Sequence, residues 1–428
     1  MTILLGATSL LFILLLAGMP IGFAIGASGA IGLFLTGGWD AMNSVLSTSP
    51  YTAVASFSLG AIPMFIFMGE MVSHGGVTDE LFETTSAWTG RLPGGLGIAT
   101  VISGAAFGAI SGSSTAGAAT LAPTTIPQLV KNGYSRKLAN GLVATVGTLA
   151  MMIPPSIALI LYGLLAEKSI GKLLIAGIIP GLILSVALCL TLLLIIRRDG
   201  SLVTKGHKYS FAEKLKALST TWSYFILFLI VFGTIYLGAA TPTEAAAIGA
   251  FGTVVLNGLR KRLSRKILVA ALTETASITA MISMMLVGAY IFGYFLVLNG
   301  VTQDLTQFIT GLGWNRYLIL ILFGVLYLVL GAFMDQVAIL TLTVPLVVPI
   351  ITGLGFDPIW FGVMVILFAE IGMITPPFGM NVFVVARCTN QPAASVFAGV
   401  WPFVGALLVV AVILSAFPSI VLWLPHFM

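Results

Sequence analysis

Two Pro-Pro pairs lie inside apolar segments of this chain, and each pair could open a binding site for a cation. Pro154-Pro155 follows the residues TVGTLAMMI, and Pro376-Pro377 follows LFAEIGMIT. A proline lacks a backbone N–H and clashes with the preceding helical turn, so two in sequence release several carbonyl groups. Bound Na⁺ is one partner for such groups, and discontinuous helices are a known way to build ion sites. A kink satisfied by neighbouring helices is the alternative, but two breaks beside polar segments favour a binding site.

A row of hydroxyl side chains forms a second candidate site. Ser111, Ser113, Ser114 and Thr115 occupy four of five consecutive positions in the stretch GAISGSSTAG. A helix that begins here would present free N–H groups and the positive end of its dipole, which suit a bound carboxylate. Contact between small residues of packed helices is the alternative, and it explains the glycines better than the hydroxyl groups. We therefore interpret these four residues as candidates for binding.

Two acidic residues lie in otherwise apolar surroundings. A carboxylate at membrane depth is costly and by default functional. Asp335 aligns with Ser113 at a step of 222 residues, and it could bind Na⁺ or hold its segment by accepting hydrogen bonds. Glu370 aligns in the same way with Thr148, and a structural role at the helix break is as consistent with its position as ion binding. Glu244 follows a proline at a predicted helix start, where a negative charge is a structural feature.

Prolines recur at the same step of 222 residues, so the chain consists of two copies of one structural unit. Six pairs keep this step: Pro20/Pro242, Pro123/Pro345, Pro127/Pro349, Pro154/Pro376, Pro155/Pro377 and Pro180/Pro402. Recurrence at a fixed period is the mark of an internal repeat. Each copy therefore contains one Pro-Pro pair and one polar segment before it.

The composition excludes a water-soluble fold. The chain is 58% hydrophobic and 8% charged, against about 25% charged residues in soluble domains, and its mean hydropathy is +1.11. Apolar runs near or above about 20 residues are typical of membrane-spanning helices. The net charge of +5 does not indicate a nucleic-acid-binding site. The basic residues cluster in short loops between apolar segments, where they indicate which side of the membrane each loop occupies.

Two apolar segments are too long for one crossing and carry small or polar residues at their centres. They are 96–130, centred on the hydroxyl row, and 317–352, centred on the residues from Gly331 to Asp335. We predict that both are re-entrant hairpins, whose tips are tolerated only where protein or a wet cavity surrounds them. The predicted fold class is an all-α polytopic membrane protein with an inverted repeat of five crossings plus one hairpin each.

The predicted parts are a first repeat at 1–200 with a broken helix at 138–166, a cytoplasmic basic connector at 201–221, and a second repeat at 222–428 with a broken helix at 359–386. Five crossings is an odd number, so the second repeat is inverted. With the basic linkers in the cytoplasm, only Lys168, Lys172 and Arg316 of the 19 basic residues fall outside, as the positive-inside rule favours. Both termini are then predicted to be periplasmic.

The sequence offers little support for metal binding by cysteine or histidine, or for ATP binding. Cys189 and Cys388 lie in apolar stretches without metal-ligand spacing, so they are interpreted as small apolar side chains. His74, His207 and His426 are predicted in separate loops and form no metal set. No phosphate-binding loop of the GxxxxGK[ST] type occurs, so ATP is not bound through that motif. Transport would then be driven by an ion gradient or by partners.

At these residues the chain resembles the large membrane subunit of TRAP transporters, the DctM-like family, over essentially its full length. The resemblance is carried by GSSTA at 112–116, MIPPS at 152–156, Gly331 with Asp335, and ITPPFGMN at 374–381. It implies an elevator-type transporter in the bacterial cytoplasmic (inner) membrane that couples Na⁺ to uptake of a C4-dicarboxylate, 2-oxo acid or sialic acid. It also implies two partners, a small four-helix membrane subunit and a periplasmic substrate-binding protein.

The resemblance also assigns roles by position. It implies about two Na⁺ sites, which would use Ser111, Ser113, Thr115, Gly147 and Thr148 in the first and Gly331, Asp335, Gly372, Met373 and Thr375 in the second. Substrate would lie between the tips, against Ser111, Ser113, Ser114, Thr115, Asp335, Met380 and Asn381. No Lys or Arg is predicted at mid-membrane, so carboxylate binding would rely on helix ends, hydroxyl groups, Na⁺ or Arg387.

Two alternative functions stay open at this point. A self-sufficient Na⁺/dicarboxylate symporter of the divalent-anion type shares the hairpin and broken-helix organisation, and it would transport without partners. An intramembrane enzyme is the more remote alternative, because Asp335 and Glu370 do not form the two matched helical positions that a catalytic carboxylate pair needs. We therefore predict a transporter and no enzymatic activity.

Overall fold

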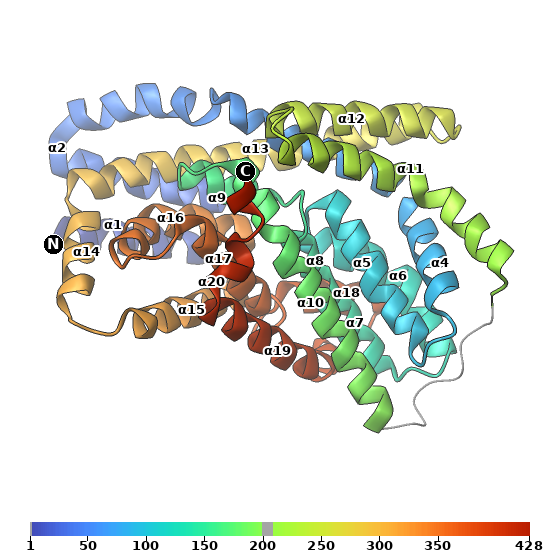
Figure 1. Cartoon of the computed structure of the whole chain (residues 1–428). Helices are drawn as coiled ribbons and strands as arrows, with labels where there is room; N and C mark the ends of the chain where they lie inside the picture. Colours follow the sequence, from blue (N-terminus) through green and yellow to red (C-terminus); the bar gives the residue numbers. More distant parts are fainter. Residues whose placement is uncertain (1, 199–208) are drawn as a thin grey trace.

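The chain folds almost entirely into helices. The computed structural model describes residues 2–198 and 209–428, and every regular element within those ranges is an α-helix or a short 3₁₀ helix. Helix α2 (Ile21–Val54) kinks at Gly38, and its first part runs beside the long helix α13 (Arg265–Leu298) along one edge of the molecule (Figure 1). The predicted all-α fold class is confirmed.

The other elements of the first half are α1 (Thr2–Leu16), η1 (Phe57–Gly60), α3 (Ala61–His74), α4 (Val77–Thr89), α5 (Gly95–Ser111), α6 (Ser114–Lys131), α7 (Arg136–Gly147), α8 (Leu149–Met152), α9 (Ile157–Leu165) and α10 (Ile170–Arg198). Those of the second half are α11 (Phe211–Tyr236), α12 (Pro242–Leu259), α14 (Val301–Gly311), α15 (Arg316–Phe333), α16 (Gln336–Gly353), α17 (Pro358–Gly372), α18 (Met380–Thr389), α19 (Ala393–Ala416), α20 (Pro418–Leu422) and η2 (Pro425–Phe427).

Helices of the two halves begin at corresponding positions. α6 begins at Ser114 and α16 at Gln336, which repeats the spacing of the prolines. The sequence did not predict α4 and α14, which begin at Val77 and Val301, because both are short and rich in polar residues. The inversion of the second half relative to the membrane stays a prediction.

Eight helices of the described chain are long and apolar enough to cross a membrane. The bent pair Arg136–Met152 and Ile157–Leu165 makes a ninth, with a 43° bend at the first Pro-Pro pair. α17 and α18 flank the second pair and have 15 and 10 residues, each fewer than the roughly 20 that a crossing needs. The chain is a multi-pass membrane protein, and the predicted ten crossings stay a prediction.

Helix α11 spans the predicted boundary between the connector and the second repeat. It runs without interruption from Phe211 to Tyr236, so the predicted boundary between the connector and the second repeat falls inside a helix. Ser210 begins it with a capping box, in which the Ser210 hydroxyl accepts from the Glu213 N–H and the Glu213 carboxylate accepts from the Ser210 N–H. This reciprocal pairing satisfies two free donors at the helix start. The rest of the connector, 199–208 with His207, lies outside the described residues.

The two broken helices pack against each other at the centre of the fold. Tyr162 of α9 and Trp360 of α17 are both fully buried. The Tyr162 hydroxyl donates to the carbonyl oxygen of Pro358 at 2.6 Å. A methyl group on Gly362 would lie 2.4 Å from the Tyr162 ring, so only glycine allows this approach. The helix pairs α5–α6 and α15–α16, which occupy the segments predicted as hairpins, pack against this centre.

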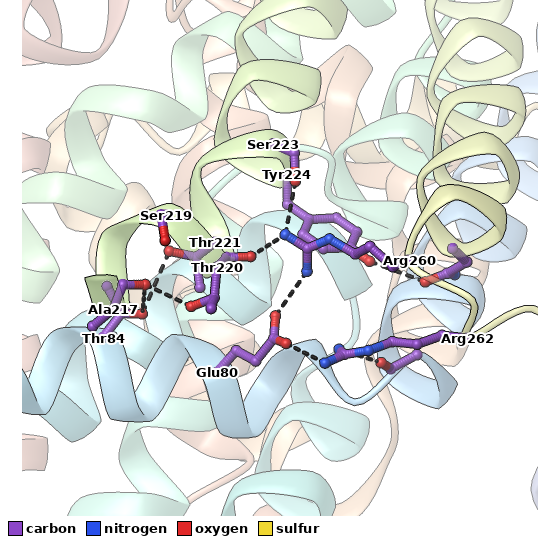
Figure 2. Close-up of polar contacts among 12 residues, drawn as sticks. Glu80, Thr84, Ala217, Ser219, Thr220, Thr221, Ser223, Tyr224, Arg260 and Arg262 are labelled. Atoms are coloured by element: carbon purple, nitrogen blue, oxygen red, sulfur yellow. Dashed lines mark hydrogen bonds and ion pairs between the residues drawn. The ribbon is translucent and has the colours of Figure 1, made fainter. Parts of the chain in front are cut away.

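An ion-pair cluster fastens α4, the helix before the first hairpin, to the second half of the chain (Figure 2). Glu80 of α4 accepts from Arg260 at 2.9 Å and also from Arg262, both at the connection between α12 and α13. The Arg260 guanidinium lies 4.7 Å from the ring centroid of Tyr224 in α11. Thr84 of α4 donates to a backbone carbonyl of α11 at 2.9 Å. The second half therefore fixes the point where the first hairpin begins.

We predict that Glu80→Ala destabilises the protein by about 1.5–3 kcal/mol, because two guanidinium groups lose a charged hydrogen-bond partner. The thermal unfolding midpoint of the purified protein in detergent measures this loss. Glu83→Ala is the matched control, since Glu83 lies on the same helix and is exposed, and its effect should stay within about 0.5 kcal/mol. Equal midpoints for the two variants would contradict the fastening role.

Candidate functional site

Each hairpin tip lies against the broken helix of its own half. A methyl group on Gly147 of α7 would lie 2.9 Å from the carbonyl oxygen of Ser114. A methyl group on Gly331 of α15 would lie 2.9 Å from the Cα atom of Gly372 in α17. Glycine at both contacts lets the backbones approach closely, as small residues do in membrane helices. Gly331 and Gly372 of the second predicted Na⁺ grouping are thus in direct contact, and in the first grouping Gly147 contacts the backbone of Ser114, between Ser113 and Thr115.

The first tip is a tight turn between α5 and α6. Gly112 has a φ of +60°, a conformation that favours glycine, and a methyl group there would lie 2.5 Å from the Pro155 carbonyl oxygen. Ser113 is the N-cap of α6 and accepts from the Ala116 N–H at 3.4 Å. The Ser113 and Thr115 hydroxyl groups lie 3.5 Å apart. The predicted hydroxyl row is therefore a helix start held against the first break.

The first break is buried and capped. Pro154, Pro155 and Ser156 have little exposed surface, and Ser156 caps α9 by accepting from the Leu159 N–H at 3.2 Å. The Thr148 hydroxyl, between α7 and α8, donates back to a carbonyl of its own helix at 2.7 Å. Thr148 therefore presents its oxygen lone pairs, but not its proton, to its surroundings.

Asp335 forms the second tip and caps the helix that follows. Its Oδ1 atom accepts from the Ala338 N–H at 3.0 Å, and the residue is half-buried. Ser113 does the same at the matching position of the first tip. The structural role proposed for Asp335 from the sequence is thus present, and its second carboxylate oxygen is not needed for the cap.

The second break satisfies part of its own backbone. The Thr375 hydroxyl donates to the Gly372 carbonyl at 2.9 Å, and the Asn381 N–H donates to the Met373 carbonyl at 3.2 Å. The Gly379 N–H reaches the second tip, where it donates to the carbonyl of Ala332 at 3.3 Å. Pro376 to Phe378 are exposed, whereas the corresponding residues of the first break are buried. The two breaks are therefore matched in sequence but not in surroundings.

A buried hydrogen-bond chain joins the first tip to the second break. The side-chain amide of Asn381 donates to the Ser114 hydroxyl at 2.6 Å, and that hydroxyl donates to Glu370 Oε2 at 2.7 Å. All three side chains are at most 1% exposed. The sequence analysis placed Ser114 and Asn381 at the site but left Glu370 open between two roles. Their contact could not be seen from residues more than 250 positions apart.

Several buried polar atoms of these segments have no hydrogen-bond partner within the described residues. They are Ser111 Oγ, Gln336 Oε1, Glu370 Oε1, Asn381 Oδ1, and both side-chain atoms of Asn140 in α7. Buried polar atoms are normally paired, so such exceptions indicate a bound ion, water or ligand. Every one of these atoms except Asn140 Nδ2 is an oxygen, the donor type that hard cations prefer.

Two predicted residues take no part in the buried hydrogen-bond chain, and one buried residue was not predicted. Met380 is 38% exposed, and its side chain carries no nitrogen or oxygen atom. Arg387 lies near the end of α18, and among the described residues it makes no ion pair with Asp335 or Glu370. Gln336 was not predicted, although it stands where Ser114 stands in the other half, and the 222-residue step was a signal that could have found it.

Helix pairs that meet at polar tips beside two broken helices define a polytopic membrane fold, and a solved structure shares it. The YdaH transporter of Alcanivorax borkumensis superimposes with a TM-score of 0.63, covers 89% of each chain and is 13% identical in sequence. At that identity the likeness concerns the fold alone.

The sequence identifies the family. The family described as "Tripartite ATP-independent periplasmic transporter, DctM component" matches residues 8–420. The C4-dicarboxylate TRAP transporter large permease protein DctM of Pseudomonas aeruginosa is 33% identical, with 95% of this chain and 94% of that protein covered. The sialic acid TRAP transporter large permease protein SiaM of Vibrio cholerae is 32% identical, with 96% of each covered. The chain belongs to the DctM family, whose members are transport proteins rather than enzymes.

One further relative is longer than this chain. The isethionate TRAP transporter permease protein DctMQ of Oleidesulfovibrio alaskensis is 32% identical over 95% of this chain, but the match covers only 64% of that protein. The family resemblance stated from the motifs is therefore confirmed along nearly the whole chain.

We predict that Ser114→Ala lowers stability by about 1–3 kcal/mol for each buried group that it leaves unpaired, namely the Asn381 amide and Glu370 Oε2. A double-mutant cycle with Asn381→Ala should give a coupling of about 0.5–3 kcal/mol, because both changes remove the same bond. Unfolding midpoints in detergent measure it. Thr120→Ala, on the same helix but outside the chain of bonds, is the control, and strictly additive effects of Ser114→Ala and Asn381→Ala would contradict the network.

Proposed function

We propose that this chain is the large membrane subunit of a Na⁺-coupled, binding-protein-dependent importer of an organic acid. The observation that carries the proposal is that hydroxyl, carbonyl and carboxylate oxygens lie at two hairpin tips and two helix breaks, with no Lys, Arg or His paired to Asp335 or Glu370 among the described residues. Of the buried oxygens without a partner, Ser111 Oγ belongs to the first proposed site. A membrane site that contains a carboxylate and several oxygen lone pairs, but no cationic side chain, is suited to bind a cation from solution.

The two proposed Na⁺ sites use the tips and breaks in equivalent ways. In the first, Ser111, Ser113, Thr115, Gly147 and Thr148 supply hydroxyl and carbonyl oxygens. In the second, Gly331, Asp335, Gly372, Met373 and Thr375 supply carbonyl oxygens and one carboxylate. Bound Na⁺ supplies positive charge beside the substrate. These residues lie on the tips and on the breaks that the tips contact. A cation bonded to oxygens of both would therefore favour the arrangement in which each hairpin is closed against its break.

An organic anion is the proposed substrate. The substrates named for the relatives include C4-dicarboxylate, sialic acid, isethionate and ectoine, all of which carry an acidic group. The starts of α6 and α16 present free N–H groups at the two tips, and helix starts are favourable sites for anions. The proposed pocket lies between these helix starts, with Ser114 and Asn381 as polar contacts.

The proposed assembly has two partners and one location. A small membrane subunit and a periplasmic substrate-binding protein complete the tripartite system to which the family belongs. The extra length of the DctMQ relative fits a small subunit fused to a large one. The proposed location is the bacterial inner membrane, with both termini in the periplasm as the basic-residue count favours.

The proposed movement is of the elevator type, in which hairpins and broken helices move against a fixed scaffold. α2 and α13 are suited to be that scaffold because their backbones pack without intervening side chains. A methyl group on Gly29 would lie 2.7 Å from the Phe292 Cα atom, and one on Gly22 would lie 2.9 Å from the backbone of Met284. Such contacts favour a rigid pair over a sliding one.

We predict that Asp335→Asn separates a capping role from a cation-binding role. Asparagine caps a helix about as well as aspartate, so it preserves the bond to Ala338 while it removes the charge. The Na⁺ concentration for half-maximal uptake, and for half-maximal protection against thermal unfolding, should rise by about tenfold, equal to about 1.4 kcal/mol. An unchanged Na⁺ dependence in Asp335→Asn, together with a lower unfolding midpoint in Asp335→Ala, would leave Asp335 as a cap only.

We predict that uptake requires both Na⁺ and the partners. Proteoliposomes would hold this chain with its small subunit, and a binding protein loaded with C4-dicarboxylate, sialic acid or isethionate would be supplied outside. An inward Na⁺ gradient should drive uptake, and replacement of Na⁺ by choline should abolish it. Transport by this chain alone would instead favour the self-sufficient symporter.

A further inference from the structure

A cluster of metal-ligand side chains lies away from the hairpin tips, between one helix of each half. Glu70 and His74 lie one turn apart on α3, and Glu274 faces them from α13. His74 Nε2 is 3.3 Å from Glu274 Oε2 and 3.6 Å from Glu70 Oε2, and the three candidate ligand atoms all lie within 4.8 Å of one another. The sequence analysis placed His74 in a loop; it is instead the last residue of a helix.

The distances fit the edges of a metal polyhedron better than a set of ion pairs. Charge-assisted N–H···O bonds are usually about 2.7–2.9 Å long, shorter than either contact of His74. Zinc bonds of about 2.0–2.2 Å to nitrogen and oxygen give tetrahedral edges of roughly 3.3–3.6 Å. A single Nε2–H also cannot point at two carboxylates at once, whereas a metal ion placed among the three atoms can bond to all of them.

The two carboxylates of the cluster have one basic partner between them. Within the part of the chain that the structure describes, His74 is the only basic side chain within 4 Å of either carboxylate. The nearby arginines are engaged elsewhere, since Arg260 and Arg262 both pair with Glu80. No arginine or lysine therefore competes with a metal ion for these carboxylates.

The cluster is reachable from solution. The side chains of Glu70, His74 and Glu274 are 19%, 32% and 53% exposed. α13 has 34 residues and is therefore about 51 Å long at ~1.5 Å per residue, well beyond the ~30 Å hydrocarbon core. Glu274 lies in the first third of α13 and His74 at the end of α3, so both lie toward the helix ends rather than at mid-membrane.

We propose that Glu70, His74 and Glu274 form a binding site for a divalent transition-metal ion of the Zn²⁺ class. One imidazole nitrogen and two carboxylate oxygens are a ligand set that zinc accepts, and three protein ligands leave a fourth position for water. The metal would bond to His74 Nε2, which leaves Nδ1 to carry the imidazole proton. Because α3 and α13 come from different halves, the bound ion ties the two halves together. The site does not depend on the proposed Na⁺ coupling or on any substrate.

The test is Zn²⁺ binding to the full chain in detergent, purified without a polyhistidine tag because such a tag binds zinc itself. Isothermal titration with ZnCl₂, supported by metal analysis after gel filtration, should give one site per chain. His74→Ala and Glu274→Gln should each weaken binding by about tenfold or more. His426→Ala and Glu83→Gln, which alter the same residue types elsewhere, should bind as the unaltered chain does.

His74→Cys separates a metal site from an ion pair. A cysteine thiolate binds zinc well but cannot replace a cationic imidazole between two carboxylates. This variant should therefore keep tight Zn²⁺ binding, and Zn²⁺ should raise its unfolding midpoint as it does that of the unaltered chain. No Zn²⁺ binding to the unaltered chain, or equal binding by His74→Ala and the unaltered chain, would overturn the proposal and leave a Glu–His–Glu ion pair only.

Discussion

Every backbone N–H and carbonyl group inside a bilayer must find its partner in the protein, because no water is present to bond it. The two Pro-Pro breaks release such groups at the centre of this fold, and the rest of the structure is arranged around them. At the second break the Thr375 hydroxyl and the Asn381 N–H take two of the freed carbonyls. The hairpin tips must then lie directly against the breaks, which is why Gly331 and Gly372 meet without side chains between them.

The same constraint explains why the site joins the two halves of the chain. A buried carboxylate needs hydrogen bonds or a cation, and Glu370 of the second half receives its one side-chain bond from Ser114 of the first. Asn381 completes the chain of bonds from the other side of the second break. Neither half therefore builds this chain of hydrogen bonds alone, and several buried oxygen atoms beside it are left without a partner among the described residues.

Matching sequence did not produce matching surroundings. Pro154-Pro155 is enclosed by protein, whereas Pro376-Pro377 is exposed. Glu80 of α4 is held by two arginines, whereas no residue of its counterpart α14 is buried. A repeat specifies local conformation twice, but each copy then meets different neighbours. α11 and the connection between α12 and α13 pack against α4, whereas α14 packs against α13 and α16. Functional asymmetry between the hairpins can arise in this way without any difference in their own pattern.

The helical class, the two tip segments and the two breaks could be predicted from the sequence, because apolar length, proline and glycine act on the backbone within a few residues. Short motifs also indicated the family. The pairs of side chains that meet are known from the folded chain: Ser114 with Glu370, Asp335 with its own helix start, and Glu70 and His74 with Glu274. These contacts join residues that are far apart in the chain or depend on rotamer and register. No local pattern encodes them, because they are set by how whole helices pack.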